Sequence, residues 1–401
     1  MNENECLRAA AATVQVNTTT IPDEPIQTLQ SPLRDATETH DNLQYPLLED
    51  RPWFHPISSL DMPIHISEAA DASFATRFRQ TLGNICASHI PRMSYVTDER
   101  LMLLADRECP WPTPARARFL IKVALNTICR NYHMVRRSFV LEILELAIKN
   151  HGSDERLHIC KLLALFALGE LYSTKTAARD GSFPGLAYFA RATKMAGVPA
   201  ERPRMDAIEN LLLLVVYSYS MNRRHSAYSF STSAIRLGTI MGMHLNIPDQ
   251  QYPDPQAREH RIRVWWTAYI LDRTCASKVG LPVSIREDTI HVDLPNTEDF
   301  GEDFGDAEYI LRSIELAKLA AQSIRSIYSR RKHENTFSQR VQLALKEFTR
   351  WMEALPPHLQ LGENSNASVS PDNVLYLHLT FNQVMMHPSV RRNTTANETS
   401  A

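Results

Sequence analysis

The chain has 401 residues, of which 44% are hydrophobic and 22% charged, a composition that supports a large folded core. Its formal net charge of −2 argues against a dedicated nucleic-acid-binding domain, which usually carries a basic excess. The longest apolar runs, at 162–169 and 211–217, are too short to span a membrane, and the amino terminus shows no secretory signal. We therefore expect an intracellular protein without a membrane partner.

Six cysteines are spread along the chain, and none of them form the closely spaced pairs that hold a zinc ion. We interpret them as reduced, mostly buried thiols, because intracellular proteins keep their cysteines reduced. No metal, catalytic or cofactor-binding residues are predicted in this chain. The six are Cys6, Cys86, Cys109, Cys129, Cys160 and Cys275.

Residues 1–65 contain seven prolines and no glycine among many Thr, Asp, Glu and Gln residues. Such a segment buries too little apolar surface to offset its conformational entropy, so it is predicted to be a disordered, flexible arm. The apolar stretch Trp53–Ile57 is the part of it that could dock onto the folded body.

From about residue 67 onward, apolar residues recur at helical spacing, and no long alternating run suggests a sheet. Thr113 followed by Pro114 predicts the start of a helix, because threonine caps the first turn and proline fits the first helical position. A second helix beginning near Arg136 is expected to end before Gly152, since glycine commonly follows a helix terminus.

Further helices are expected in 202–221 and 225–242, joined by a turn near Asn222, and in a shorter segment between Gly185 and Gly197. Short links between successive helices favour antiparallel neighbours. The predicted fold class is therefore all-α, a multi-helix bundle of antiparallel helix pairs with a disordered N-terminal arm.

The acidic segment Asp288–Gly305 contains glycine and proline and is expected to be a loop between helices. One more helix is expected in Pro371–Pro388, before a polar tail at 391–401. The chain is thus divided into an arm at 1–65, an all-α body at 66–390 and the tail.

The segment REHRIRVWWTAYILDR, residues 258–273, places four arginines, two tryptophans and one aspartate in an otherwise apolar helix. Aromatic residues share one helical face and aliphatic residues cover another, which is typical of a helix packed on both sides. Arg261 and Arg263 are expected to stack on aromatic rings or to pair with carboxylates. The indole N–H groups of Trp265 and Trp266 need acceptors if they are buried.

Asp272 and Arg273 stand at the carboxyl end of this helix, where the helix dipole disfavours an acid. Asp272 is therefore expected to accept hydrogen bonds from a buried arginine or from backbone groups of the turn at Gly280–Pro282. We interpret the segment as an internal brace and not as a ligand or DNA contact, because buried charges persist only when they are paired.

Several motifs follow one another between Met205 and Pro295: a helix of small residues ending in MGMHLN, then REHRIRVWW, LDR, a GLP turn and DLP. In this order they closely resemble the fungal-specific transcription factor domain, the middle homology region of zinc-cluster regulators, and especially its xylanolytic-activator-like subset. The resemblance extends from about 70 to 390, with its core at 180–295. The family-signature residues are Arg261, Arg263, Trp265, Trp266, Asp272, Arg273, Gly280, Pro282, Asp293 and Pro295.

This resemblance implies a non-catalytic, all-α regulatory region of a transcription regulator that acts in the nucleus. Its partners would be transcription co-regulators or a small-molecule effector, and a homodimer is one option. DNA would be contacted only through a zinc cluster, and zinc would be the cofactor of that module alone. The signature residues are expected to have a structural role.

The chain departs from the family plan because it lacks the six-cysteine module and ends where relatives usually continue into further helices. Three alternatives therefore stay open: a helical adaptor, a truncated fragment without independent function, and an all-α enzyme of isoprenoid type. No fixed-period repeat supports the adaptor. The usual catalytic motifs are absent, and Glu302–Asp306 only faintly resembles the acidic metal-binding run of helical terpene synthases.

Overall fold

The computed structural model divides the chain by its contacts into Met1–Gln44 and Tyr45–Ala401, and every residue it describes lies in the second unit. Most of the predicted arm, including its expected disorder, therefore lies outside the described residues. The described residues are 53–55, 62–67, 70, 73, 75, 76, 79, 95–149, 155–174, 183–197, 201–298, 300–328, 335–361 and 371–398.

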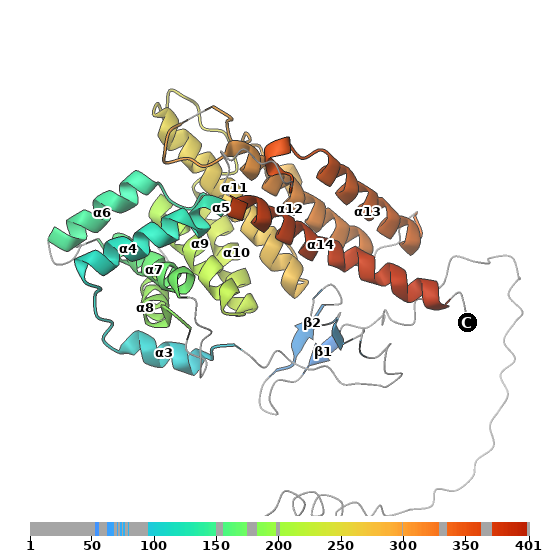
Figure 1. The fold of residues 1–401 in the computed structure, drawn as a ribbon, viewed down its shortest axis with the longest axis horizontal. Helices are drawn as coiled ribbons and strands as arrows, with labels where there is room; N and C mark the ends of the chain where they lie inside the picture. The colour runs from blue at the N-terminus through green and yellow to red at the C-terminus, as the bar shows by residue number, and fades with distance from the viewer. Residues whose placement is uncertain are drawn as a thin grey trace, which may run out of the picture. The chain divides into compact units, whose positions relative to one another are not determined.

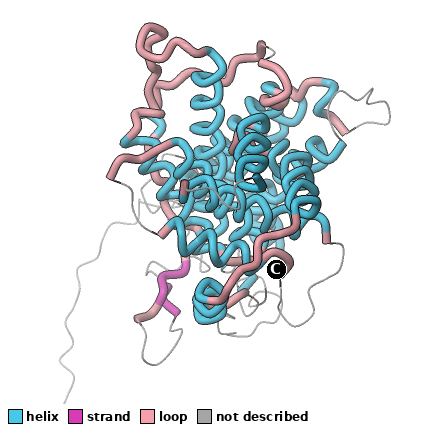
Figure 2. Tube along the Cα trace, turned by 90° about the vertical axis from the view of Figure 1, so that its left-hand side faces the viewer, coloured by secondary structure: helices cyan, strands magenta, loops and turns pink. Residues whose placement is uncertain are grey.

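Helices make up nearly all of the regular secondary structure among the described residues, which confirms the all-α fold class (Figure 1; Figure 2). Short 3-10 turns occur at Glu287–Thr289 and Pro357–Leu359. The α-helices are α3 (Asp98–Asp106), α4 (Pro114–Asn126), α5 (Ile128–Asn131), α6 (Arg137–Lys149), α7 (Arg156–Ser173), α8 (Leu186–Ala196), α9 (Met205–Ser220), α10 (Arg224–Ile240), α11 (Pro255–Val279), α12 (Ala307–Tyr328), α13 (Phe337–Glu353) and α14 (Pro371–Glu398).

The helix starts follow the capping pattern of the sequence. Thr113 accepts a hydrogen bond from the backbone N–H of Arg116 at 3.4 Å, and Pro114 opens α4, as predicted. The turn between α9 and α10 places Asn222 in the left-handed region at φ 61°, which asparagine tolerates better than most residues. These local signals explain why helix boundaries could be read from the sequence.

Neighbouring helices form a continuous series across the bundle. The α3 helix packs on α8 and α8 on α7, while α7 also contacts α4 and α9. The series continues from α9 through α10 and α11 to α12, which packs against both α13 and α14 (Figure 1). Three of these helices, α7, α9 and α11, are buried on all sides, which is why their apolar residues are not confined to one stripe.

One helix pair departs from the antiparallel pattern because its connection is long. The segment after α11 returns to the amino-terminal half of that helix, where Arg263 donates hydrogen bonds to the carbonyls of Gly305 and Asn296. Because α12 starts at Ala307, beside this point, α11 and α12 run in the same direction. The expected loop at Asp288–Gly305 thus serves as a crossover connection.

Two local features differ from the expectations. The strands β1 (Trp53–His55) and β2 (Ile64–Ile66) pair antiparallel within and next to the predicted arm, and three residues are too few for an alternating pattern to be recognised. The α14 helix continues past Pro388 to Glu398, because proline at this position removes one donor but leaves later helical hydrogen bonds available.

Gly169 sets the distance between α7 and α4. A β-carbon at this position would lie 2.4 Å from the backbone oxygen of Leu120, closer than any real contact. Gly169→Ala is therefore expected to destabilise the protein by about 1–3 kcal/mol, since overpacking outweighs the helix propensity of alanine. Urea unfolding measures this free energy.

Gly197→Ala is the matched control, because a β-carbon there meets no atom closer than 3.6 Å. The control should leave the unfolding midpoint nearly unchanged. Equal midpoints for the Gly169 and Gly197 variants would contradict the close packing of α7 on α4.

Candidate functional site

The α11 helix carries the predicted basic and aromatic segment through the middle of the bundle. Asp254 caps its start, where the side chain accepts a hydrogen bond from the backbone N–H of Gln256, and Gly280 caps its end in the left-handed conformation. The prediction that α11 is packed on more than one side is confirmed. Its buried charged residues are Glu259, Arg261, Arg263, Asp272 and Arg273.

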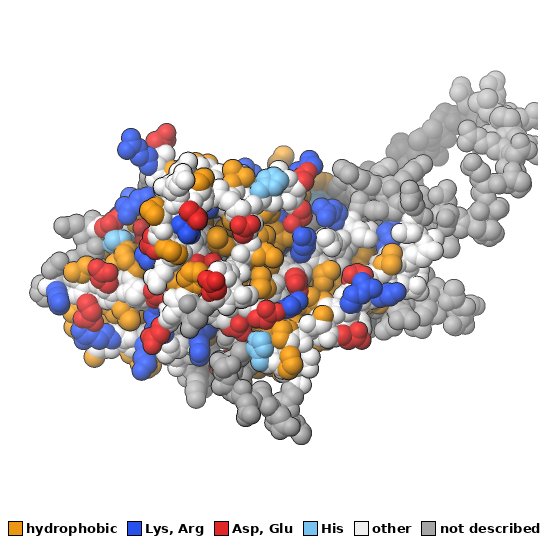
Figure 3. Space-filling view, turned by 90° about the horizontal axis from the view of Figure 1, so that it is seen from above, with side chains coloured by type: hydrophobic (Ala, Val, Ile, Leu, Met, Phe, Trp, Pro, Cys, Tyr) orange, Lys and Arg blue, Asp and Glu red, His pale blue; other side chains and the backbone are white. Residues whose placement is uncertain are grey.

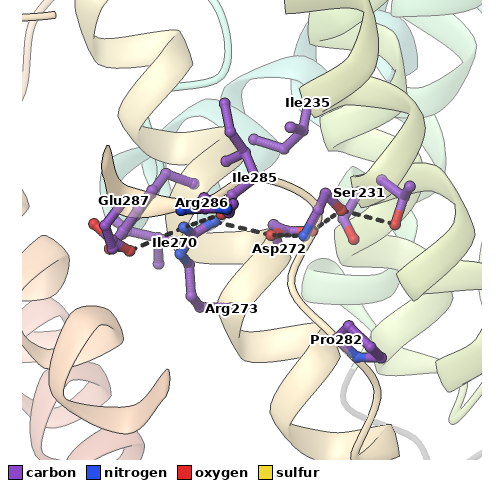
Figure 4. A network of polar contacts seen from close by, with 12 residues as sticks. Ser231, Ile235, Ile270, Asp272, Arg273, Pro282, Ile285, Arg286 and Glu287 are labelled. Carbon is purple, nitrogen blue, oxygen red and sulfur yellow. Dashed lines mark hydrogen bonds and ion pairs between the residues drawn. The ribbon is translucent and has the colours of Figure 1, made fainter. Parts of the chain in front are cut away.

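Asp272 is fully buried and joins α11 to the loop that follows it (Figure 4). Its carboxylate accepts hydrogen bonds from Nη1 of Arg273 at 2.9 Å, from the backbone N–H of Ser284 at 3.0 Å, and from the Ser284 hydroxyl. The predicted arginine partner is confirmed. The predicted backbone donors at Gly280–Pro282 are wrong, because the loop needs two further residues to turn back toward the carboxylate.

Arg273 extends this contact to a second acid. Its guanidinium lies 3.6 Å from the ring centroid of Tyr269, and Nη2 donates to the Ile285 carbonyl and to Glu287, both at 3.0 Å. Tyr269 also donates from its hydroxyl to Glu287 at 2.6 Å. The burial of Asp272 raises its pKa above the usual value, and the hydrogen bonds from Ser284 and Arg273 oppose that change.

Arg263 forms a second buried pair near the start of α11. Its Nε donates to Glu259 at 2.5 Å, and both side chains are almost completely buried. The guanidinium also lies 5.1 Å from the ring centroid of Phe304. Glu259 in turn accepts from the backbone N–H of Asn296 at 3.2 Å. The pair therefore fixes the crossover loop on α11, and Arg263 both pairs and stacks as predicted.

Arg261 points the other way, toward the end of α10. It donates to the carbonyls of Leu245 at 3.1 Å and Gly242 at 2.5 Å. These carbonyls follow the last turn of α10, where backbone acceptors lack helical partners. Arg261 thus caps the neighbouring helix through these two carbonyls, a role that differs from the predicted stacking or carboxylate pairing.

The two tryptophans differ in their hydrogen bonding. Trp266 donates from its indole N–H to the Asp293 carbonyl at 2.8 Å, which satisfies the predicted need for an acceptor. Trp265 is buried with no acceptor for its indole N–H, and its ring fills the space over Gly238, where a β-carbon would lie 3.1 Å from it. Trp265 therefore acts through packing alone.

The remaining signature residues lie in the loop after α11. Gly280 leaves room for the preceding chain, since a β-carbon there would lie 2.5 Å from the Ser67 side chain. The Pro282 carbonyl accepts from the Tyr228 hydroxyl at 2.8 Å. Asp293 contributes backbone contacts while its side chain is exposed, and Pro295 is buried.

A second buried network was not predicted from the sequence. Lys161 of α7 is fully buried and pairs with Asp206 and Glu209 of α9. Glu209 also lies 2.7 Å from Nε2 of His260, whose Nδ1 lies 2.9 Å from Nε2 of His133. The network links α7, α9, α11 and the segment before α6. In the sequence, this network is indicated by a single charged residue within each of two apolar runs.

The charges in this network shift two pKa values in the same direction. Burial raises the pKa of Glu209, but the ammonium of Lys161 and the imidazole of His260 outweigh it and lower that pKa to about 2. Burial, followed by the charges of His260, Arg263 and Arg136, lowers the pKa of His133 well below its usual value. Both groups therefore bind protons more readily in the unfolded chain than in the folded one.

This difference predicts a loss of stability in acid. A group with a lowered folded-state pKa contributes stability above its unfolded pKa, and that contribution disappears as the pH falls. The loss should begin near pH 6.5 through His133 and deepen below about pH 4.5 through Glu209, on the order of 3 kcal/mol for Glu209. Urea unfolding midpoints at a series of pH values measure it.

His133→Phe should reduce the decline between neutral pH and about pH 5.5, because phenylalanine does not titrate. His291→Phe, at an exposed histidine, is the control and should leave the decline intact. An unchanged pH profile in the His133 variant would contradict the assignment.

The acidic run that faintly resembled a metal-binding motif has structural contacts. Asp303 accepts from the backbone N–H of Ser138 at 2.6 Å and from its hydroxyl, in the first turn of α6. Phe304 stacks on His133, with ring centroids 5.2 Å apart. Within the described residues, no group of three or more histidine, cysteine or acidic side chains is arranged to hold a metal ion.

The fold and its buried ion pairs define a large all-α domain whose interior charges join helices and loops to one another. The family model described as "Fungal specific transcription factor domain" matches residues 120–360. The chain belongs to this family, and the match begins within α4 and extends past the Pro357–Leu359 turn. No solved structure matches.

Several fungal regulators are similar to the chain. An uncharacterized transcriptional regulatory protein of Schizosaccharomyces pombe is 23% identical over 69% of this chain and 36% of its own length. Transcription regulator galc of Aspergillus niger is 25% identical over 51% of this chain and 25% of its own length. Activator of stress genes 1 of Saccharomyces cerevisiae is 25% identical over 69% of this chain and 31% of its own length. The chain thus covers about a third or less of these relatives.

Proposed function

We propose that this chain is the non-catalytic regulatory region of a nuclear transcription regulator and acts through protein or small-molecule contacts. The observation that carries the proposal is the family match over 120–360, which includes α5 to α13 and both buried networks. The relatives are transcriptional regulators, which supports a role in controlling transcription.

We further propose that contact with DNA, where it occurs, is made by a zinc-cluster module and not by the helical bundle. The chain has a formal net charge of −2. On the face shown in Figure 3, basic and acidic side chains are interspersed and do not form a continuous basic surface. No described helix is long and apolar enough to cross a membrane. Zinc would then be needed only by the DNA-binding module.

A tethered reporter tests the regulatory role. The full chain is fused to an unrelated DNA-binding domain in a fungal host, upstream of a reporter gene carrying the matching site. We expect the fusion to change reporter transcription several-fold relative to the DNA-binding domain alone. An Arg273→Ala fusion should lose this effect, since its bundle lacks the pair with Asp272. Reporter levels equal to those of the DNA-binding domain alone would contradict the proposal.

An electrophoretic mobility shift with fungal promoter DNA tests the second part. The purified chain should give no sequence-selective shift. Tight and selective binding would show that the bundle itself reads DNA and would overturn this part of the proposal.

A further inference from the structure

The glycine that caps the end of α11 lies in direct contact with residues that precede the bundle. Gly280 adopts the left-handed conformation at φ 66°. A β-carbon on it would lie 2.5 Å from both the Cβ and the Oγ of Ser67, and 2.8 Å from the backbone nitrogen of Ala70. Because real β-carbons essentially never come within 3.0 Å of such atoms, only glycine allows this approach.

Gly242 shows that the left-handed conformation alone does not create such a contact. It follows α10 with the same φ of 66°, yet a β-carbon on it would meet no described atom within 4 Å. At both positions glycine avoids the strain that a side chain would cause at positive φ. Gly280 therefore meets a second requirement, which is the close approach of Ser67 and Ala70.

The residues that contact Gly280 belong to a hydrogen-bonded turn. Ser67 directly follows β2, and its carbonyl accepts from the backbone N–H of Ala70 at 3.0 Å and from the Ser73 hydroxyl at 2.6 Å. Ala70 and Ser73 are buried. Hydrogen bonding and burial protect a backbone amide from exchange with solvent, so the Ala70 amide reports whether this turn is in place.

The loop after Gly280 is fixed to the interior of the bundle. The Pro282 carbonyl accepts from the Tyr228 hydroxyl of α10 at 2.8 Å. Two residues further on, the backbone N–H and the hydroxyl of Ser284 donate to the buried carboxylate of Asp272. The position of Gly280 therefore depends on an anchor four residues away, and loss of that anchor should loosen the contact at Gly280.

We propose that the Gly280 turn is an intramolecular docking point for Ser67 and Ala70. Through Ser284, the docking point is coupled to the buried carboxylate of Asp272. Docking then favours the buried pair and the pair favours docking, because coupling between two sites is reciprocal. The regulatory meaning rests on the proposed function: a partner or small molecule that shifts the state of the bundle would change how the preceding chain is held.

Hydrogen exchange of the full chain, read at the Ala70 amide, tests the docking point. Gly280→Ala should accelerate this exchange about tenfold or more, since the added methyl group displaces the turn. Gly242→Ala is the matched control, because it introduces the same backbone strain without a contact, and it should leave the exchange unchanged. Ser67→Leu alters the contact from the other side, outside the bundle, and should match Gly280→Ala. Equal exchange in the Ser67 and Gly242 variants would overturn the proposal.

Two destabilising substitutions test the coupling. Asp272→Ala removes the acceptor of Ser284, whereas Lys161→Met breaks the other buried network. Both should lower the global stability by similar amounts. Only Asp272→Ala should accelerate exchange at Ala70, again about tenfold, because this amide is expected to exchange by local opening of its turn. Equal acceleration by the two substitutions, or none by either, would reject the coupling and with it the proposal.

The tethered reporter separates this proposal from the proposed function. Ser67→Leu in the fusion should change the reporter level about twofold or more relative to the unmodified fusion, and an unchanged level would overturn the regulatory meaning of docking. Equal exchange in all variants of a chain that still changes the reporter rejects the docking point and leaves the proposed function intact. The expected exchange differences in a chain without any effect on the reporter do the reverse.

Discussion

Asp272→Ala is expected to destabilise the protein by about 3–5 kcal/mol, because it removes one partner of a fully buried ion pair. Arg273 and the backbone N–H of Ser284 would then be left in the interior without their shared acceptor. For a domain of this size, the loss corresponds to a fall of the melting temperature on the order of 5–10 °C. Differential scanning calorimetry at neutral pH measures it.

Asp288→Ala is the matched control in the same loop. Asp288 is exposed and pairs with Arg286, which is also exposed, so its removal should not change the melting temperature measurably. If the melting curve of the Asp272 variant coincided with that of the control, the buried pair would contribute nothing to stability. The interpretation of this segment as an internal brace would then be wrong.

Lys161→Met is the second substitution with a large expected effect. It leaves Glu209 and Asp206 without the ammonium that holds them, and Glu209 is buried. We expect a loss of about 3–5 kcal/mol, since an unpaired buried charge is much less stable than a pair. Urea unfolding at pH 7 measures the loss.

A double variant separates the missing charge partner from simple changes in packing. Lys161→Met combined with Glu209→Gln removes both charges, and the amide oxygen can still accept from His260. The double variant should be more stable than Lys161→Met alone, because neutral partners of similar shape are tolerated in place of a buried pair. Additive losses would argue that Lys161 acts through packing and not through its charge.

The sequence predicted the fold class because its signals were local. A threonine followed by proline at Thr113, left-handed positions at Asn222 and Gly280, and apolar residues at helical spacing each act within a few residues. The family resemblance between Met205 and Pro295 also rests on ordered local motifs. These features can be recognised without knowing which helices pack against each other.

The contacts between distant segments could not be predicted in the same way. Lys161, Glu209, His260 and His133 come from elements up to 127 positions apart, so neither spacing nor helix periodicity places them together. A charged residue within an apolar run, as in CKLLALF around Lys161, indicates a buried partner but does not name it.

For the signature residues, the sequence predicted the chemical type of each interaction partner more reliably than the particular residue that supplies it. An arginine partner for Asp272 followed from burial, but the backbone donor was Ser284 because the course of the loop after Gly280 depends on its packing against α10. Likewise, Arg263 stacks on Phe304, which belongs to the crossover loop and lies 41 positions further along the chain. Loop paths of this length are set by tertiary contacts and not by local propensity.

Native-state hydrogen exchange of the backbone amides of α11 tests the central claim most directly, namely that the tryptophan and arginine segment is an internal brace. Amides from Glu259 to Cys275 should exchange only on global unfolding and be among the slowest in the chain, because they lie in a helix buried on all sides. The amides of α3, at the edge of the bundle, should exchange much faster. Exchange of α11 as fast as that of α3 would contradict the account.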